Sequence, residues 1–218
     1  MITLPLTRGR TLDHVAAVYD ALSPVMLFGQ EARLSRPCLE FLSDSRISSV
    51  LDLGCGTGTL TIEIARLLAD RGGRVSGIDA APKMIDVALR KASHLANAYF
   101  DVAAAEALPF FDDSFDYVIS TFFFHHIDLE LKVRALDEAF RVLKPGGLFV
   151  IIDVDTPTNI FGKICAWAGY FLFQQEEIRE NIEGKLRLAI GQSRFGSFEE
   201  VSHHQGYISV FKLIKEGL

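Results

Sequence analysis

An apolar run that leads into three closely spaced glycines constrains the fold of this chain more than any other feature. Residues 47–53 have the pattern of a buried strand, and Gly54, Gly56 and Gly58 then stand at alternate positions before a helical period that begins at Thr59. Glycine permits a sharp turn and lets a ligand approach the bare backbone. Ligands of open α/β sheets bind outside the carboxyl ends of the strands. The run therefore predicts a strand, a tight turn and a helix. A ligand site at the turn is one interpretation, and a tight strand-to-helix connection without a ligand is the alternative.

Short apolar runs alternate with helical periods through the centre of the chain. Strands that are apolar almost throughout are typical of a parallel sheet buried on both faces. Alternation with helices predicts right-handed crossovers and an α/β fold, a doubly wound Rossmann-like sheet of seven strands with a C-terminal antiparallel hairpin. The predicted strands are 47–53, 74–79, 98–104, 116–122, 148–154, 196–203 and 207–214, and the predicted helices are 59–71, 82–92, 128–143 and one long apolar stretch over 158–180.

The length of 218 residues favours one domain, and a hydrophobic content of 49% suffices for its core. Two helices over 11–44 are expected at the front, broken near Ser23 and Pro24. The predicted single domain, 1–218, divides into a helical N-terminal cap (1–45), a core (46–155), a helical insert or lid (156–195) and a terminal β-hairpin (196–218).

Composition and charge exclude several classes of protein. The net charge is −6 and there is no polybasic run, so neither nucleic acid nor an anionic membrane is an expected general partner. Cys38, Cys55 and Cys165 are too few and too scattered for a disulfide framework or a zinc site. The longest apolar patch, 160–173, contains Lys163 and is shorter than the roughly 20 residues of a membrane-spanning helix. These features favour a cytoplasmic protein without a transmembrane segment.

The spacing of the glycines limits which class of ligand the turn can bind. A dinucleotide fingerprint, G-x-G-x-x-G or -A, would place its third small residue on Thr59, and no Gly-Lys-Ser/Thr follows as a P-loop requires. Asp79 ends the second predicted strand, 21 residues after Gly58. A carboxylate there can accept two hydrogen bonds from a ribose diol. The alternative is an exposed aspartate that caps the turn before Pro82.

Several further motifs follow in order over residues 50–154, about half the chain. Together they resemble the class I S-adenosylmethionine-dependent methyltransferases, most closely the ubiquinone/menaquinone-type (methyltransferase type 11) branch. The motifs are Asp52-x-Gly54-x-Gly56-x-Gly58, Gly77-Ile78-Asp79 with Pro82-Lys83-Met84, Glu106-Ala107-Leu108-Pro109-Phe110, Ser114-Phe115-Asp116 and Leu143-Lys144-Pro145-Gly146-Gly147.

The resemblance implies S-adenosyl-L-methionine as the cofactor. It places Asp52 near the ammonium of the methionine part, Asp79 at the ribose hydroxyls and Met84 against the adenine. Tyr19, in a Tyr-Asp pair similar to one near the start of the branch, closes over the cofactor or acceptor, or packs on a helix face. The implied cofactor-binding residues are Asp52, Gly54, Cys55, Gly56, Gly58, Asp79, Ala80, Met84, Ala105, Glu106 and Tyr19.

One position departs from the family pattern. The branch has a Gly-Asp-Ala-Glu run whose aspartate receives the adenine amino group, and this chain has Ala103-Ala104-Ala105-Glu106 instead. Either the region of Ala105 and Glu106 reads adenine through backbone groups, or the affinity is lower. One lost hydrogen bond costs on the order of 1 kcal/mol, which does not abolish binding.

The loop after the fourth predicted strand, 121–128, is the predicted place of the chemistry. Methyl transfer needs alignment of the acceptor and exclusion of water, and it needs a base only if the acceptor must lose a proton. His126 or His125 is the expected residue that touches or deprotonates the acceptor, since branch members often carry a histidine here; the alternative is a histidine that only orders the turn. No metal site is expected, because His203 and His204 are far from this pair in sequence and read as edge residues.

Phenylalanine is unusually abundant, with 17 residues against five tyrosines and one tryptophan. Two concentrations stand out, 122–124 beside the histidines and 161–173 in the insert. The second can be core, a lid over an apolar acceptor, or a face that contacts a membrane surface. Together with the resemblance, this predicts a methyltransferase that acts on a small apolar acceptor, a quinol-like ring or a lipid.

Other hypotheses remain open at this point. Within the same class, the acceptor can be a phospholipid amine or a small metabolite that is methylated on nitrogen. A nicotinamide dehydrogenase shares the fold, but the glycine spacing and the lack of a Tyr-x-x-x-Lys set disfavour it. A non-catalytic cofactor-binding subunit is favoured only by the missing aspartate at Ala104. The expected partner is a small-molecule acceptor; peripheral membrane contact and a homodimer stay open.

Overall fold

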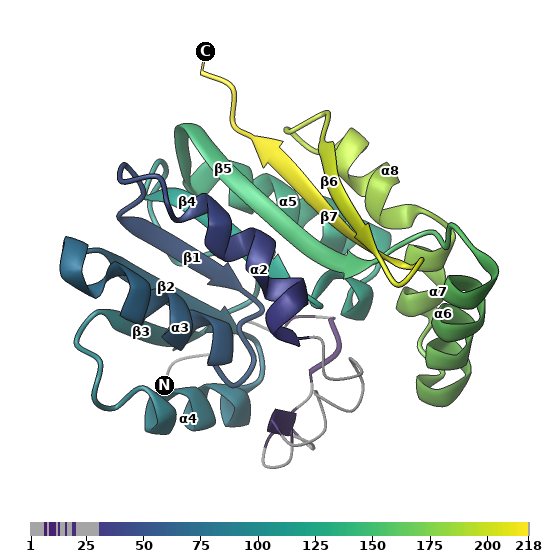
Figure 1. Cartoon of the computed structure of the whole chain (residues 1–218), viewed down its shortest axis with the longest axis horizontal. Helices are drawn as coiled ribbons and strands as arrows, with labels where there is room; N and C mark the ends of the chain where they lie inside the picture. Colours follow the sequence, from purple (N-terminus) through teal and green to yellow (C-terminus); the bar gives the residue numbers. More distant parts are fainter. Residues whose placement is uncertain are drawn as a thin grey trace.

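In this computed structural model, seven strands form one mixed sheet in the order β3-β2-β1-β4-β5-β7-β6, with all but β7 and β6 joined in parallel (Figure 1). The structure describes residues 7, 9–11, 13, 16, 19, 20 and 31–217, so the predicted break at Ser23 and Pro24 lies outside it. The strands are β1 Ser49–Leu53, β2 Arg74–Asp79, β3 Ala98–Val102, β4 Phe115–Thr121, β5 Leu143–Val154, β6 Glu199–His204 and β7 Ile208–Ile214. The predicted α/β sheet with its terminal antiparallel hairpin is confirmed.

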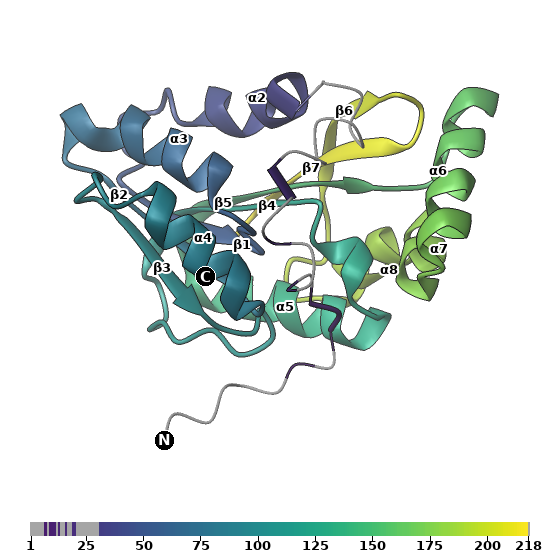
Figure 2. The ribbon, with the colours of Figure 1, turned by 90° about the horizontal axis from the view of Figure 1, so that it is seen from below.

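Helices cover both faces of this sheet (Figures 1 and 2). Side chains alternate along each strand, so Tyr117 and Ile119 of β4 pack under α2 and α3, whereas Val118 packs under α5 and α8. The helices are α2 Glu31–Phe41, α3 Thr59–Leu68, α4 Pro82–Lys91, α5 Leu129–Val142, α6 Ile160–Phe173, α7 Glu176–Ile182 and α8 Lys185–Gln192, with short 3₁₀ turns η2 Ala69–Arg71 and η3 Phe124–His126.

The single long helix predicted over 158–180 is wrong. Gln174 adopts a left-handed conformation, with φ of 50°, and ends α6, and α7 begins two residues later. Gly184, with φ of 87°, separates α7 from α8. The helical period of the sequence continues across Gln174, so the pattern alone does not reveal that the chain turns there. Strand β5 also begins earlier than predicted, at Leu143, because a bulge opposite Phe115 and Tyr117 accommodates the Pro-Gly-Gly segment.

The first turn of α6 rests on the turn between β6 and β7. That turn has positive φ at both Gln205 and Gly206, as a tight hairpin requires. The Asn159 side chain caps α6 by accepting the Gly162 N–H at 2.7 Å, and a Cβ added to Gly162 would lie 2.0 Å from the Gly206 carbonyl oxygen. Contact between two glycine backbones therefore fixes α6 to the hairpin.

We expect Gly162→Ala to lower the free energy of unfolding by about 1–3 kcal/mol, because the added methyl group forces the hairpin and helix apart. Gly169→Ala, in the same helix but with open space around it, is the matched control and should gain roughly 0.5–1 kcal/mol from helix propensity. Chemical denaturation of both variants measures this. Equal effects at the two positions would contradict the close contact.

Candidate functional site

The site lies at the carboxyl ends of β1, β2 and β4, where the strand order reverses between β1 and β4. This is the position at which doubly wound sheets bind their ligands. Two cavities open there, one of about 470 Å³ and one of about 20 Å³, and Gly54 forms part of the wall of both.

The glycine turn after β1 joins the two cavities. Gly54, Gly56 and Gly58 all have positive φ, between 54° and 77°, so the predicted tight turn is built from left-handed backbone. The N–H groups of Gly54 and Cys55 both donate to the Ile78 carbonyl at 2.9 Å, which fastens the turn to the end of β2. A Cβ on Gly54 would lie 2.6 Å from the Phe123 ring, so no larger residue fits.

The larger cavity has a polar side and an apolar side. Tyr19, Asp52, Cys55 and Gly56 of the predicted cofactor site line it. The apolar side comes from α2, the start of α3 and the ends of β4 and β5, through Leu34, Leu60, Phe122 and Ile152. Phe122 is held at φ of 53°, a strained conformation for a bulky residue and one that is concentrated at functional sites.

Asp52 presents an unpaired carboxylate oxygen at this cavity. Its side chain is buried; Oδ2 accepts a hydrogen bond from Thr61 Oγ1 at 2.5 Å, and Oδ1 has no partner. Burial raises the pKa of Asp52 to about 7, although the bond from Thr61 lowers it. A buried oxygen without a donor is costly, so the arrangement suits a ligand that brings a positively charged donor, as an ammonium group does.

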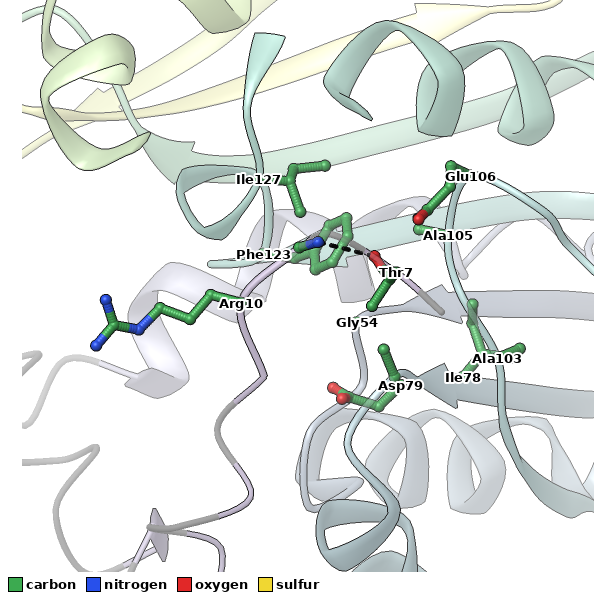
Figure 3. A pocket seen from close by; sticks show the side chains of 12 residues that line it. Thr7, Arg10, Gly54, Ile78, Asp79, Ala103, Ala105, Glu106, Phe123 and Ile127 are labelled. Atoms are coloured by element: carbon green, nitrogen blue, oxygen red, sulfur yellow. Dashed lines mark hydrogen bonds between the residues drawn. The ribbon is translucent and has the colours of Figure 1, made fainter. Parts of the chain in front are cut away.

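Asp79 ends β2 and lies at the wall of the smaller cavity (Figure 3). Its Oδ1 accepts the Ala81 N–H at 2.8 Å and its Oδ2 accepts the Gly56 N–H at 3.0 Å. Burial raises its pKa, while these two bonds lower it. Each carboxylate oxygen has a further lone pair, so Asp79 can still accept hydrogen bonds from a diol.

The other walls of the smaller cavity come from Ala80, Ala105 and Glu106, which the sequence predicted as cofactor residues. Figure 3 shows Glu106 and Asp79 on opposite sides of this cavity. Ala104, at the position of the missing aspartate, is buried. Glu106 is therefore a nearby carboxylate that can serve an amino group here.

Residues near the chain start also reach the smaller cavity. Thr7, Gly9 and Arg10 line it, and the Arg10 N–H donates to the His126 carbonyl at 3.2 Å. A Cβ on Gly9 would lie 2.7 Å from the Ile127 side chain. A volume of about 20 Å³ holds roughly one water molecule, so this segment leaves little space beside Asp79.

Asp20, the aspartate of the Tyr-Asp pair, lines the larger cavity, although the sequence analysis assigned it no role. It accepts hydrogen bonds from Lys91 Nζ at 2.7 Å and from Thr57 Oγ1 in the glycine turn. Burial opposes its ionisation, but these bonds outweigh burial and hold the pKa of Asp20 below its usual range. Asp20 thereby ties Tyr19, which also lines the larger cavity, to the glycine turn.

Two predicted cofactor residues form part of neither cavity wall as described. Met84 is buried beside Ala16 and Ala81. Gly58 caps the start of α3, and a Cβ on it would lie 2.7 Å from Phe100. Both residues support the walls from behind, which a motif match cannot distinguish from direct contact.

His125 forms a dyad with a residue that sequence reasoning missed. Its Nδ1 lies 2.7 Å from Asp153 Oδ1, and Asp153 is fully buried near the end of β5. The N–H groups of Phe124 and Val154 both donate to Asp153 at 2.7 Å, which fixes the position of the carboxylate. In the tautomer in which Nδ1–H donates to Asp153, Nε2 of His125 is left as a proton acceptor.

His126 has a different environment. Its Nδ1 lies 3.1 Å from Oε1 of Gln175, the buried residue that precedes α7. Burial and the neighbouring His125 lower the pKa of His126 well below its usual value, so this imidazole is neutral. Gln175 connects the loop after β4 to the α6–α7 region. Among the described residues, neither histidine forms part of the walls of the two cavities.

A separate cluster of metal-ligand residue types, Asp155, Glu200 and His203, lies behind β7. Arg187 already occupies the space between the carboxylates, 2.5 Å from Asp155 and 2.8 Å from Glu200. His203 Nδ1 lies 2.8 Å from Ser209 Oγ. This group is an ion-pair network that joins α8 to the hairpin.

Comparison with known proteins adds to this geometry. The methyltransferase-domain family matches residues 50–147, which span the glycine turn, Asp79 and the histidine loop. The demethylmenaquinone methyltransferase of Staphylococcus aureus is 32% identical over 165 residues, which are 75% of this chain and 66% of that protein. The match thus spans about two thirds of the relative's length.

Solved structures share the fold. A SAM-dependent methyltransferase from Aquifex aeolicus superimposes with a TM-score of 0.64 at 20% identity, covering 94% of this chain and 99% of that one. The geranyl diphosphate C-methyltransferase of Streptomyces coelicolor A3(2), solved with S-adenosyl-L-homocysteine, gives a TM-score of 0.61 at 18% identity, over 84% of this chain and 77% of that one. At these identities the likeness bears on the fold.

Proposed function

Because this chain belongs to the class I S-adenosylmethionine-dependent methyltransferases, we propose that it transfers a methyl group from S-adenosylmethionine to a small apolar acceptor of the quinol class. The observation that carries the proposal is the larger cavity, which places the glycine turn and the unpaired oxygen of Asp52 beside an apolar wall. The charged part of the cofactor and an apolar acceptor could therefore bind side by side in the same cavity.

The described residues fit the parts of the cofactor. Asp52 Oδ1 would receive the ammonium of the methionine part, which supplies the missing donor. Asp79 would accept the ribose hydroxyls, and Glu106 would accept the adenine amino group in place of the family's aspartate. Positive φ in the glycine turn lets the cofactor lie against bare backbone.

His125 is the proposed base. S-adenosylmethionine supplies a methyl group on a positively charged sulfur, which is already activated for displacement. A quinol hydroxyl becomes a better nucleophile, at oxygen or at the neighbouring ring carbon, once it has lost its proton. The ring of His125 lies next to the larger cavity, its centroid 6.4 Å from that of the wall residue Phe122. His125 Nε2 would take that proton, and the resulting imidazolium would be stabilised by Asp153, 2.7 Å from Nδ1. Neutral His126 and the phenylalanines before it would exclude water from the acceptor.

The quinol class is supported by the apolar wall of Leu34, Leu60, Phe122 and Ile152 and by the name of the relative, a demethylmenaquinone methyltransferase. An apolar acceptor of this kind dissolves in lipid rather than in water. The described part of the chain contains no helix long and apolar enough to cross a membrane.

The test is methyl transfer from isotopically labelled S-adenosylmethionine to a reduced naphthoquinone that bears a short prenyl chain and lacks the ring methyl. Mass spectrometry should detect both S-adenosylhomocysteine and the methylated ring. Phosphatidylethanolamine, supplied in parallel, should stay unmethylated. Methylation of the amine lipid and not of the quinol would reject the quinol class while leaving the enzyme class intact.

We expect cofactor affinity to rise about tenfold between pH 6 and pH 8, because the ammonium binds the ionised form of Asp52, whose pKa is about 7. The free energy of unfolding of the cofactor-free protein depends on pH in the opposite direction. Because the pKa of Asp52 is raised in the folded protein, this group contributes stability below about pH 4, and the contribution is lost as the pH rises through about 7. Calorimetry with S-adenosylhomocysteine measures the affinity. Asp52→Asn should bind weakly and with a flattened pH dependence; an unchanged slope would remove Asp52 from this role.

A further inference from the structure

One face of α6 is covered by apolar side chains that are exposed in the described structure. Ile160, Phe161, Ile164, Ala168, Phe171 and Leu172 are all exposed, and the five large residues among them are 59–80% accessible. At 100° per residue these six positions fall within about one third of the helix circumference. We call them the apolar stripe. The opposite side of α6, with buried Gly162 and Ala166, faces the protein.

The stripe lies at one end of the molecule. Figures 1 and 2 both show α6 beyond the β6–β7 hairpin, apart from the helices that cover the sheet. It is a single convex helix and not the floor of a groove. Its connection to the site is short, because α7 follows directly and Gln175 between the two helices contacts His126.

The charges around the stripe are unusual for this acidic chain. Residues 156–175 carry one charge, Lys163, which is positive and exposed beside the stripe. The carboxylates of α7 are largely paired: Arg179 lies 2.6 Å from Glu176 and 3.7 Å from Glu183. Glu180 lies 3.3 Å from Lys132. The surface next to the stripe therefore presents no unpaired run of negative charge toward phosphate groups.

A protein partner fits this surface poorly. A stable protein interface uses roughly 20–30 residues on each side, whereas the stripe offers six on one helix. A helix that lies in the membrane interface needs only an apolar face, a nearby basic residue and aromatic residues at its margin. Beside the stripe, Lys163 is the basic residue, and Trp167 and Tyr170 are the aromatic residues.

We propose that α6 docks the protein on a phospholipid bilayer, with the helix axis in the plane of the surface and the stripe below the headgroups. This inference rests on the proposed function in one respect, since an apolar acceptor dissolved in the bilayer would reach the site from that side. Docking puts the α6–α7 connection, and with it the histidine loop, next to the lipid surface.

The experiment uses the full chain and vesicles of phosphatidylcholine, with and without phosphatidylglycerol. Trp167 is the only tryptophan of the chain and lies on α6, so its emission reports directly on this helix. We expect the protein to co-sediment with both kinds of vesicle and the emission to shift to shorter wavelength. The double variant Ile164→Glu/Phe171→Glu should reduce co-sedimentation at least about tenfold. Phe111→Glu, at a residue that is 90% exposed but lies elsewhere, is the matched control and should bind like the unaltered protein.

Absence of co-sedimentation and of the emission shift would overturn the proposal. So would a concentration-dependent dimer in light scattering that the double variant abolishes, because a second copy would then cover the stripe. Calorimetry with S-adenosylhomocysteine in the absence of vesicles separates this inference from the proposed function. Cofactor binding and methylation of a water-soluble quinol without vesicle binding would reject only the docking, whereas failure of cofactor binding would reject the function.

Discussion

Replacing Asp79 with alanine weakens the binding of S-adenosylhomocysteine about 100-fold. The ribose hydroxyls lose a charged acceptor, and each hydrogen bond to a charged group contributes on the order of 1.5–3 kcal/mol. The burial of Asp79 strengthens the effect, because a lost bond is not replaced by one to bulk water. Calorimetry at constant pH measures the change.

Asp79→Ala also removes the acceptor of the Gly56 and Ala81 N–H groups, so a structural loss must be separated from a binding loss. Asp79→Asn keeps one oxygen acceptor without the charge and should lie between the unaltered protein and the alanine variant. Both variants are compared at a temperature at which circular dichroism shows them folded. Undiminished affinity in the folded alanine variant would place the ribose elsewhere.

Replacing His125 with alanine lowers kcat for methyl transfer by a factor of about 100 or more, which is the range that a positioned general base contributes. Cofactor affinity should change little, because the side chain of His125 is hydrogen-bonded to Asp153 and not to a residue of the proposed cofactor site. Single-turnover measurements with saturating cofactor separate the chemical step from binding.

Asp153→Asn tests the dyad more finely. The amide is close in size to the carboxylate, but it cannot stabilise an imidazolium or fix its tautomer as the charged group does. We expect a loss in kcat smaller than that of His125→Ala and a changed dependence of rate on pH. If His126→Ala abolished methyl transfer while His125→Ala remained active, the base would be His126 instead.

The position of the glycine turn beside Asp79 was predictable because its signals are local. The glycine spacing and Asp79 lie at the ends of strands whose apolar runs are visible in the sequence, and parallel pairing brings those ends together. The strand that ends at Asp79 was predicted with both its boundaries, 74–79. The 158–180 helix was wrong because its break depends on one left-handed residue, Gln174, that carries no strong turn signal.

The His125–Asp153 pair was not predictable from a local pattern. Its members are 28 residues apart and meet only because β4 and β5 are neighbours in the sheet. A signal was nevertheless present, since Asp153 is a carboxylate in the otherwise apolar run 148–154. Asp20 was missed for a related reason: its partners, Thr57 and Lys91, belong to elements whose relative position only the folded chain defines.

The small volume beside Asp79 has a consequence for the timing of the catalytic cycle. If adenosine binds beside Asp79, as proposed, it needs far more space than the single water molecule for which there is room, so Thr7, Gly9 and Arg10 would have to move. The Arg10–His126 hydrogen bond has to break in that step. Entry of the cofactor and departure of the spent nucleoside would then both depend on movement of the same residues, which would link the timing of the two steps.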